Sequence, residues 1–358
     1  MINIIIGTKA QLIKMAPVMV ELARRGCEYR YISTGQHQDT MEDILDDFGL
    51  PGPDIVLYDR GDVVSSKAVM PWFFTVLYKS LFSKKKIFGR KLSRADHVLV
   101  HGDTLSTLIG AIMGRLAGAQ VVHVESGLRS FSYFHPFPEE IIRVLTFRLS
   151  DIMFCPDERA ADNLKRVDGV IVNTSGNTLY DSWRYFSKSD KEKAVVNERF
   201  GLVSLHRYEN FQSLQAAERI VSLLEMISDQ HKLRFVLHKP TERALKKYGL
   251  FRRLMKNDNI SCMSRVAYFD FMRLLQDAEF LVSDGGSNQE ECFYMGKPLL
   301  LLREKTERYE GLGENCMLSC YSEERVRSFS SNVEAYLRDA IPLVHSPSQV
   351  IVDRLIRK

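Results

Sequence analysis

Short apolar runs alternate with amphipathic stretches along the whole chain, and this alternation most constrains its fold. The pattern is typical of βαβ units, in which helices join parallel strands. The sequence therefore predicts an α/β fold of doubly wound parallel sheets. Predicted strands span residues 4–6, 29–33, 97–100, 121–124, 152–155 and 170–173 in the first half, and 203–205, 234–237, 280–282 and 298–302 in the second. Amphipathic helices are predicted at 105–116 and 216–227.

The length of 358 residues exceeds what one hydrophobic core usually serves, so two domains are expected. With 45% hydrophobic and 26% charged residues, the chain can bury full cores. We expect a first Rossmann-like domain of residues 1–168, completed by a C-terminal helix at 345–358 that packs back on it. Residues 169–344 form the second Rossmann-like domain. The polar stretch at 188–193 separates the two runs of alternation.

The charge balance argues against a nucleic-acid partner, because 49 basic and 45 acidic residues leave a formal charge of only +4. One basic cluster, at 84–94, follows an apolar run at 70–78 that is shorter than the roughly 20 residues of a spanning helix. The pair could contact a membrane surface. A buried helix followed by a solvated face is the commoner meaning and is favoured. The amino terminus lacks the features of a signal peptide, so a cytoplasmic location is expected.

The six cysteines are scattered and lie mostly beside apolar residues, which predicts reduced, buried thiols. Cys316 and Cys320 are four residues apart, with no second pair or histidine nearby. Zinc sites need such a second pair, so no metal site is expected.

The turn after the first predicted strand opens a helix that carries Lys9 and Lys14. It has no G-x-G-x-x-G pattern, so a dinucleotide fingerprint is absent. Lysines near a helix amino terminus can bind phosphate through charge and dipole together. Solvated lysines are the alternative.

Acidic residues follow strands or begin a helix at three places in the first half: Asp103, Glu125 and Glu139, the last in a helix that also bears Arg143. Alternatively, Asp103 or Thr104 is only the N-cap of a helix, and Glu139 only interacts favourably with a helix dipole. Parallel strands bind ligands beyond their carboxyl ends, where three acids together indicate proton chemistry.

In the second half, His206 ends a strand, and histidine is the side chain best suited to moving charge near neutral pH. Further along, Gly285, Gly286 and Ser287 lie between a strand and a helix. Exposed backbone N–H groups at a helix start can hold a diphosphate. Glycines also serve turns for purely conformational reasons, which is the alternative.

Taken together, these segments resemble the UDP-N-acetylglucosamine 2-epimerase family over nearly the whole chain. The resemblance implies the two-domain GT-B architecture. Its motifs here are Gly7-Thr8 with residues 14–17, residues 101–104, 123–129, 136–140 and 176–178, His206-Arg207, and residues 289–291 and 296–298.

Carried over position by position, the family's functional residues imply a set of roles for this chain. The acid/base carboxylates fall on Asp103, Glu125 and Glu139, and the catalytic histidine falls on His206. The substrate and UDP contacts fall on Lys9, Lys14, Arg143, Asn177, Gly285, Gly286, Ser287 and Glu291. The family geometry implies sugar chemistry in the first domain, UDP binding in the second, an active site in the cleft between them, and a homodimer.

The family's reaction explains these residue types. UDP leaves C1 as a proton leaves C2, giving a 2-acetamidoglucal, and both are added back with the proton on the other face. A positioned base and acid must act while the C1–O bond cleaves. His206 and the lysines would stabilise the departing diphosphate. No metal or redox cofactor is required.

Several positions depart from the family pattern. Lys9 replaces an arginine, which loses bidentate phosphate geometry. The family's Asp-Ser-Gly-Gly becomes residues 284–287, and its Thr-Glu-Arg-Pro-Glu becomes residues 306–310. The segment by which reversible epimerases recruit an activating UDP-sugar is only partly present, at 36–39. These differences leave the C4 and C6 substituents of the sugar, and allostery, open.

Three alternatives remain. A hydrolysing epimerase would add water to the intermediate and release N-acetylmannosamine and UDP. A GT-B glycosyltransferase could use the same diphosphate-binding helix start, although sugar transfer does not need three carboxylates. A nucleotide-sugar sensor would bind without turnover. The motifs at 123–129 and 136–140 resemble the reversible branch most, so reversible epimerisation is favoured.

Overall fold

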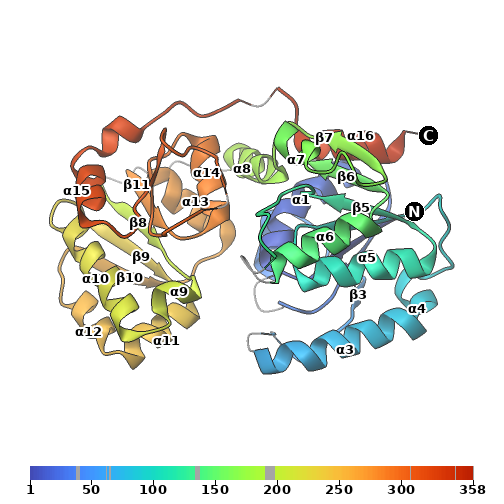
Figure 1. The fold of residues 1–358 in the computed structure, drawn as a ribbon, viewed down its shortest axis with the longest axis horizontal. Coiled ribbons are helices and arrows are strands. Elements are labelled where there is room, and N and C mark those ends of the chain that lie inside the picture. Colours follow the sequence, from blue (N-terminus) through green and yellow to red (C-terminus); the bar gives the residue numbers. More distant parts are fainter. Residues whose placement is uncertain are drawn as a thin grey trace. The chain divides into compact units, whose positions relative to one another are not determined.

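The computed structural model describes residues 1–37, 41–61, 63, 66–133, 138–189, 198–306, 308–342 and 344–357. The chain divides into two compact units. The first is Met1–Tyr185 with Leu343–Lys358, and the second is Phe186–Pro342. Each unit is built on its own sheet of parallel strands, seven in the first and six in the second, as Figure 1 shows. The prediction of two parallel-sheet α/β domains is therefore confirmed.

The first sheet has the strand order β3-β2-β1-β4-β5-β6-β7. This order reverses beside β1, as in a doubly wound sheet, so that the carboxyl ends of its strands share one edge. The strands are β1 (Ile2–Ile6), β2 (Tyr29–Ser33), β3 (Ile55–Val56), β4 (His97–His101), β5 (Gln120–Val124), β6 (Ile152–Cys155) and β7 (Val170–Asn173).

Helices cover the first sheet, and two of them begin at threonine caps. Thr8 caps α1 and Thr104 caps α5, each accepting a backbone N–H in the first turn. The helices are α1 (Lys9–Arg24), α2 (Glu42–Asp47), α3 (Ser66–Phe82), α4 (Lys84–Phe88), α5 (Leu105–Ala117), α6 (Glu139–Leu149), α7 (Glu158–Asp162), α8 (Thr178–Ser189) and α16 (Pro347–Ile356).

The last helix, α16, belongs to the first unit. Arg25 at the end of α1 forms an ion pair with Asp353 of α16. The buried carboxylate of Asp181 in α8 accepts the backbone N–H of Ser348 at 2.7 Å. At its other limit the unit extends beyond residue 168, because β7 pairs with β6 and α8 follows it. Residues 190–193 of the expected polar boundary lie outside the described residues.

The second sheet has the order β10-β9-β8-β11-β12-β13 and likewise reverses, beside β8. Its strands are β8 (Gly201–Ser204), β9 (Leu233–Leu237), β10 (Ile260–Ser264), β11 (Phe280–Ser283), β12 (Leu299–Leu301) and β13 (Cys316–Leu318). Its helices are α9 (Tyr208–Phe211), α10 (Leu214–Ser228), α11 (Lys239–Lys247), α12 (Leu250–Met255), α13 (Tyr268–Asp277), α14 (Gly286–Met295), α15 (Glu323–Ser331) and a 3₁₀ turn at Val333–Tyr336.

Two expectations need correction. Strands β3, β10 and β13 were not predicted from the sequence, and all three lie at sheet edges. Most residues of these three strands are half-buried or exposed, so their apolar signal is weaker than that of a fully buried central strand. Among the six cysteines, all free, Cys155, Cys292 and Cys316 are buried, whereas Cys320 is exposed. No helix among the described residues is long and apolar enough to span a bilayer.

Candidate functional site

The carboxylate of Glu125 is the centre of a polar cluster beyond the carboxyl ends of β4 and β5. Glu125 directly follows β5 and has a left-handed backbone conformation, with φ of 59°. Its Oε1 accepts the ammonium of Lys14 from α1 at 2.5 Å and the amide of Asn177 at 2.6 Å. Nε2 of His101, the last residue of β4, lies 3.4 Å from Oε2. Three side chains from distant parts of the chain therefore converge on one carboxylate.

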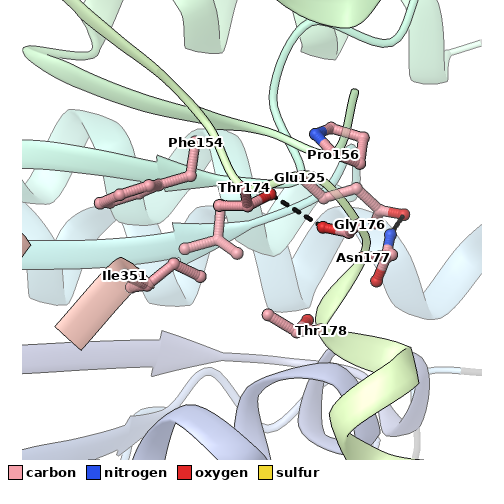
Figure 2. Close-up of a pocket in the computed structure, with 9 residues that line it drawn as sticks. Glu125, Phe154, Pro156, Thr174, Gly176, Asn177, Thr178 and Ile351 are labelled. Carbon is pink, nitrogen blue, oxygen red and sulfur yellow. Dashed lines mark hydrogen bonds between the residues drawn. The ribbon is translucent and has the colours of Figure 1, made fainter. Parts of the chain in front are cut away.

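A small pocket opens beside this carboxylate within the first unit (Figure 2). The hydrogen bond from Asn177 to Glu125 lies at the polar side of the pocket, whereas Phe154 and Ile351 form part of its apolar lining. Thr174 closes the turn before α8 by donating to the carbonyl of Gly176 at 2.8 Å. The lining residues are Val124, Glu125, Phe154, Pro156, Thr174, Gly176, Asn177, Thr178 and Ile351.

Asp103 lies in the turn between β4 and α5 and is bound by Arg143 of α6. Nε and one terminal nitrogen of Arg143 donate to Oδ2 of Asp103 at 2.9 and 2.6 Å. Of the two candidate N-caps, Thr104 caps α5 and Asp103 does not. About a third of the Asp103 side chain is exposed, whereas Arg143 is buried.

The same arginine reaches a second carboxylate, Glu140, at 3.4 Å. Glu140 also accepts Arg129 at 2.5 Å and the backbone N–H of Ser130 at 3.0 Å. Burial opposes ionisation of Glu140, but the Ser130 N–H and the Arg129 guanidinium together lower its pKa below the usual value. Glu140 is thus a structural anion that holds Arg143 and Arg129 in place.

Glu139, the first residue of α6, differs from its neighbour. Its Oε2 is buried and has no hydrogen-bond partner among the described residues. Buried polar atoms are nearly always paired, so an unpaired carboxylate oxygen indicates a position that a ligand can occupy. Residues 136 and 137 of the predicted motif lie outside the described residues.

His123 and Gln11 fix the strand ends that carry these groups. His123 is fully buried; its Nε2 lies 2.8 Å from the carbonyl of Gly102, and its Nδ1 lies 3.0 Å from the Ser126 hydroxyl. Burial lowers the pKa of His123 to about 4, so it is neutral and structural. Gln11 accepts the backbone N–H of Gly7 and donates to the carbonyl of His101. Neither residue was among the predicted site residues.

Lys9 is half-buried in the first turn of α1, where its backbone N–H lies 3.4 Å from Nδ1 of His37. Lys9 is therefore at the start of a helix, as the sequence predicted. Residues 38 and 39 of the segment predicted to bind an activating UDP-sugar lie outside the described residues.

In the second unit, His206 follows β8 and is held through its backbone by Asp284, which follows β11. The fully buried carboxylate of Asp284 accepts the N–H of His206 at 3.1 Å, that of Arg207 at 3.0 Å and the amide of Asn210 at 2.9 Å. The His206 imidazole remains 44% exposed and packs 4.9 Å from the ring of His238. Asp284 was not predicted, although it directly precedes the glycine pair.

Gly285, Gly286 and Ser287 form the start of α14, where backbone N–H groups have no acceptor within the helix. A Cβ on Gly285 would lie 2.9 Å from Oδ1 of Asn288 and 3.1 Å from Cε1 of His206, so close packing excludes a side chain there. The helix start and the histidine are therefore neighbours within this unit.

Glu291, one turn into α14, is buried beneath this helix start. Its carboxylate accepts the amide of Asn288 at 2.8 Å and the hydroxyl of Tyr268 at 3.1 Å. The amide of Gln289 donates to the carbonyl of Glu310 at 2.9 Å, and its Oε1 accepts Thr306. The 306–310 segment thus packs on α14; Glu307 lies outside the described residues.

In this α/β protein, the first unit places Asp103 and Glu125 beyond the carboxyl ends of its parallel strands, and the second unit places the start of α14 beyond the end of β11. Among the described residues, no three His, Cys, Asp or Glu side chains are grouped as a metal ion would need.

Comparison with known proteins specifies the class further. The family model described as UDP-N-acetylglucosamine 2-epimerase matches residues 20–340. A UDP-N-acetylglucosamine 2-epimerase of Methanococcus maripaludis is 32% identical over 88% of this chain and 86% of its own. The UDP-2,3-diacetamido-2,3-dideoxy-D-glucuronate 2-epimerase of Pseudomonas aeruginosa is 30% identical over 94% and 93%. The UDP-GlcNAc 2-epimerase of Methanocaldococcus jannaschii, solved with UDP-GlcNAc and UDP, has a TM-score of 0.84 at 28% identity, covering 99% of both chains. This chain belongs to the UDP-N-acetylglucosamine 2-epimerase family.

Proposed function

We propose that the chain inverts C2 of a UDP-N-acetylhexosamine, with UDP-N-acetylglucosamine as the first substrate to test. The carrying observation is the convergence of Lys14, Asn177 and His101 on Glu125, beside the Asp103–Arg143 pair. A carboxylate positioned by three partners suits abstraction or return of a weakly acidic proton, which needs fixed geometry.

In the proposed reaction, a carboxylate takes the proton from C2, and the C2–H electron pair forms the C1–C2 double bond. The C1–O bond breaks, and UDP leaves with its electron pair. An acid on the opposite face returns a proton to C2 of the 2-acetamidoglucal, and a diphosphate oxygen attacks C1 again. The two proton transfers need two groups in different environments.

Glu125, Asp103 and Glu139 supply such different environments. Glu125 is paired with a buried lysine, Asp103 is bound by Arg143 and partly exposed, and Glu139 has a buried oxygen without a partner among the described residues. We assign the proton transfers at C2 to these three side chains. Lys14, predicted to contact phosphate, is assigned instead to holding Glu125.

The second unit is proposed to hold UDP. The first-turn N–H groups of Gly286 and Ser287 would bind the diphosphate, and the exposed imidazole of His206 would neutralise its rising charge as the C1–O bond breaks. Glu291 would accept a hydrogen bond from a ribose hydroxyl. This requires that it give up its hydrogen bond to Asn288 or Tyr268.

Proton NMR of the enzyme with UDP-N-acetylglucosamine in deuterated water tests the proposal. We expect a mixture of UDP-linked C2 epimers with deuterium at C2 and only traces of free UDP. Stoichiometric UDP with free N-acetylmannosamine would establish the hydrolysing reaction instead. Absence of C2 exchange with UDP-N-acetylglucosamine and with its 2,3-diacetamido uronate relative would refute the proposal.

A further inference from the structure

A chain of contacts within the second unit connects the hydroxyl of Tyr321 to the imidazole of His206. Tyr321 follows β13 and is half-buried. Its hydroxyl lies 2.7 Å from Oδ1 of Asn210, a fully buried residue of α9. Nδ2 of Asn210 donates to Oδ2 of Asp284 at 2.9 Å. Oδ1 of Asp284 lies 3.3 Å from Nδ1 of His206, so the phenol reaches the histidine through two buried side chains.

The direction of these hydrogen bonds is fixed by the surroundings of Asn210. Its Nδ2 lies close to two acceptors, the Asp284 carboxylate and the carbonyl of Leu302 at 3.3 Å, so the donor end of the amide points to them. Oδ1 therefore faces Tyr321, and the phenol is the donor. Burial raises the pKa of Tyr321, which keeps the phenol protonated and able to donate.

The backbone that presents Tyr321 is strained. Cys320 and Tyr321 both have left-handed conformations, with φ of 47° and 57°, which are uncommon for residues other than glycine. Such conformations persist where the surrounding structure holds them, and they concentrate at functional sites. The guanidinium of Arg219, in α10, lies 3.8 Å from the centre of the Tyr321 ring. The side chain is therefore held at its ring by a cation and at its hydroxyl by Asn210.

We propose that Tyr321 is a positioning residue for His206, acting through Asn210 and Asp284. This inference rests on the proposed function, in which the imidazole meets the departing diphosphate. The phenol fixes the Asn210 amide, the amide occupies Oδ2 of Asp284, and Oδ1 is left facing Nδ1 of His206. An imidazolium whose Nδ1–H is held by a carboxylate has its Nε2–H left for an oxygen of the ligand, so the chain of contacts sets the orientation of the ring.

The Tyr321→Phe variant tests the inference, because it keeps the ring beside Arg219 and removes only the hydroxyl. Turnover with UDP-N-acetylglucosamine should fall roughly 10-fold or more, since a misplacement of about 1 Å can cost ~100-fold. KM should change little, because the charge that His206 meets rises only as the C1–O bond breaks. In protein with isotope-labelled histidine, the imidazole NMR signals of His206 should shift.

Tyr248→Phe is the matched control. Tyr248 is likewise half-buried, and its hydroxyl donates to the carbonyl of Gln212, the residue that follows α9, at 3.1 Å. The control removes a hydroxyl beside the same helix without breaking the chain of contacts to His206. Turnover and the His206 signals should therefore remain as in the wild type.

Adding Cys320→Gly to Tyr321→Phe separates stability from positioning. Glycine adopts a φ of 47° without strain, so the double variant should melt at a higher temperature than Tyr321→Phe while its turnover stays low. Turnover that recovers together with the melting temperature would overturn the inference, because Tyr321 would then act only through stability.

Two other results would also overturn it: His206 signals that are unchanged in folded Tyr321→Phe, or an equal loss of turnover in Tyr248→Phe. A wild-type enzyme without epimerase turnover would refute the proposed function. The His206 signals are recorded without substrate, so their shift in Tyr321→Phe would support the inference even then, and their constancy would overturn it.

Discussion

Both carboxylate oxygens of Asp284, at the end of β11, lie 3.1 Å from the backbone nitrogen of His206, at the end of β8. The Asp284 side chain is completely buried, and it also accepts the N–H of Arg207. Because β8 and β11 are neighbouring parallel strands, this carboxylate joins two strand ends at the edge that carries the histidine. Asp284 therefore positions His206 by hydrogen bonds to its backbone, besides lying close to its imidazole.

Changing Asp284→Asn should lower the melting temperature and the turnover number together. The amide would place an N–H₂ group against backbone N–H donors, and an unmade buried hydrogen bond costs about 1–3 kcal/mol. Calorimetry and kinetics measure the two effects. Asp270→Asn, at an exposed residue paired with Arg273, is the control and should change neither. A normal melting temperature for Asp284→Asn would mean that the carboxylate does not order this edge.

The three carboxylates assigned to proton transfer should each be essential. Asp103→Asn, Glu125→Gln and Glu139→Gln should reduce turnover by ~10²-fold or more, the usual scale for a lost acid or base. Asp162→Asn, on the exposed side of α7, serves as the control. Near-normal turnover in all three variants would mean that these carboxylates have structural roles and do not transfer protons.

The same variants should differ in stability. Glu125→Gln leaves the buried ammonium of Lys14 without its anion, and removing one partner of a buried pair is strongly destabilising. Glu139→Gln removes an oxygen that has no partner among the described residues, so we expect little loss of stability. Thermal unfolding followed by circular dichroism compares the two, and equal melting temperatures would contradict the assigned environments.

Backbone access at the start of α14 should govern UDP affinity. Gly286→Val should weaken UDP binding by blocking approach to the helix start, and Gly285→Ala should do so by pressing on Asn288 and His206. Gly52→Ala is a matched control, because a Cβ there meets nothing within 4 Å. Titration calorimetry with UDP measures the change, and unaltered affinity in both variants would place the diphosphate elsewhere.

The first unit should lose stability in mild acid because of His123. Its folded pKa is about 4, below the unfolded value near 6.5, so the unfolded chain binds more protons between these pH values. Stability supplied by the neutral form is complete above pH 6.5 and is lost as the pH falls towards 4. From pH 7 to pH 5 the loss from this group is about 2 kcal/mol. Urea unfolding of wild type and His123→Asn at both pH values should show a shallower pH dependence in the variant.

The alternation in the sequence determined the fold class and most residues of the candidate site. In parallel sheets the carboxyl ends of strands meet at one edge, so residues that follow strands, such as Asp103, Glu125 and His206, could be selected without coordinates. The ordered motifs likewise predicted the family, which the comparisons confirm. The central strands were found because burial on both faces leaves a continuous apolar run.

Tertiary structure alone decided which side chains meet. Lys14, Asn177 and His101 contact Glu125 because three separate segments end at one edge of the first sheet, and spacing along the chain does not encode that convergence. Strand β10 escaped prediction because most of its residues are half-buried or exposed and carry a weak apolar signal. The exposure of Phe74 on α3 was likewise hidden, since an apolar residue in a sequence does not tell which helix face the core covers. Hydrophobic periodicity sets the kind of element, whereas long-range packing decides its partners.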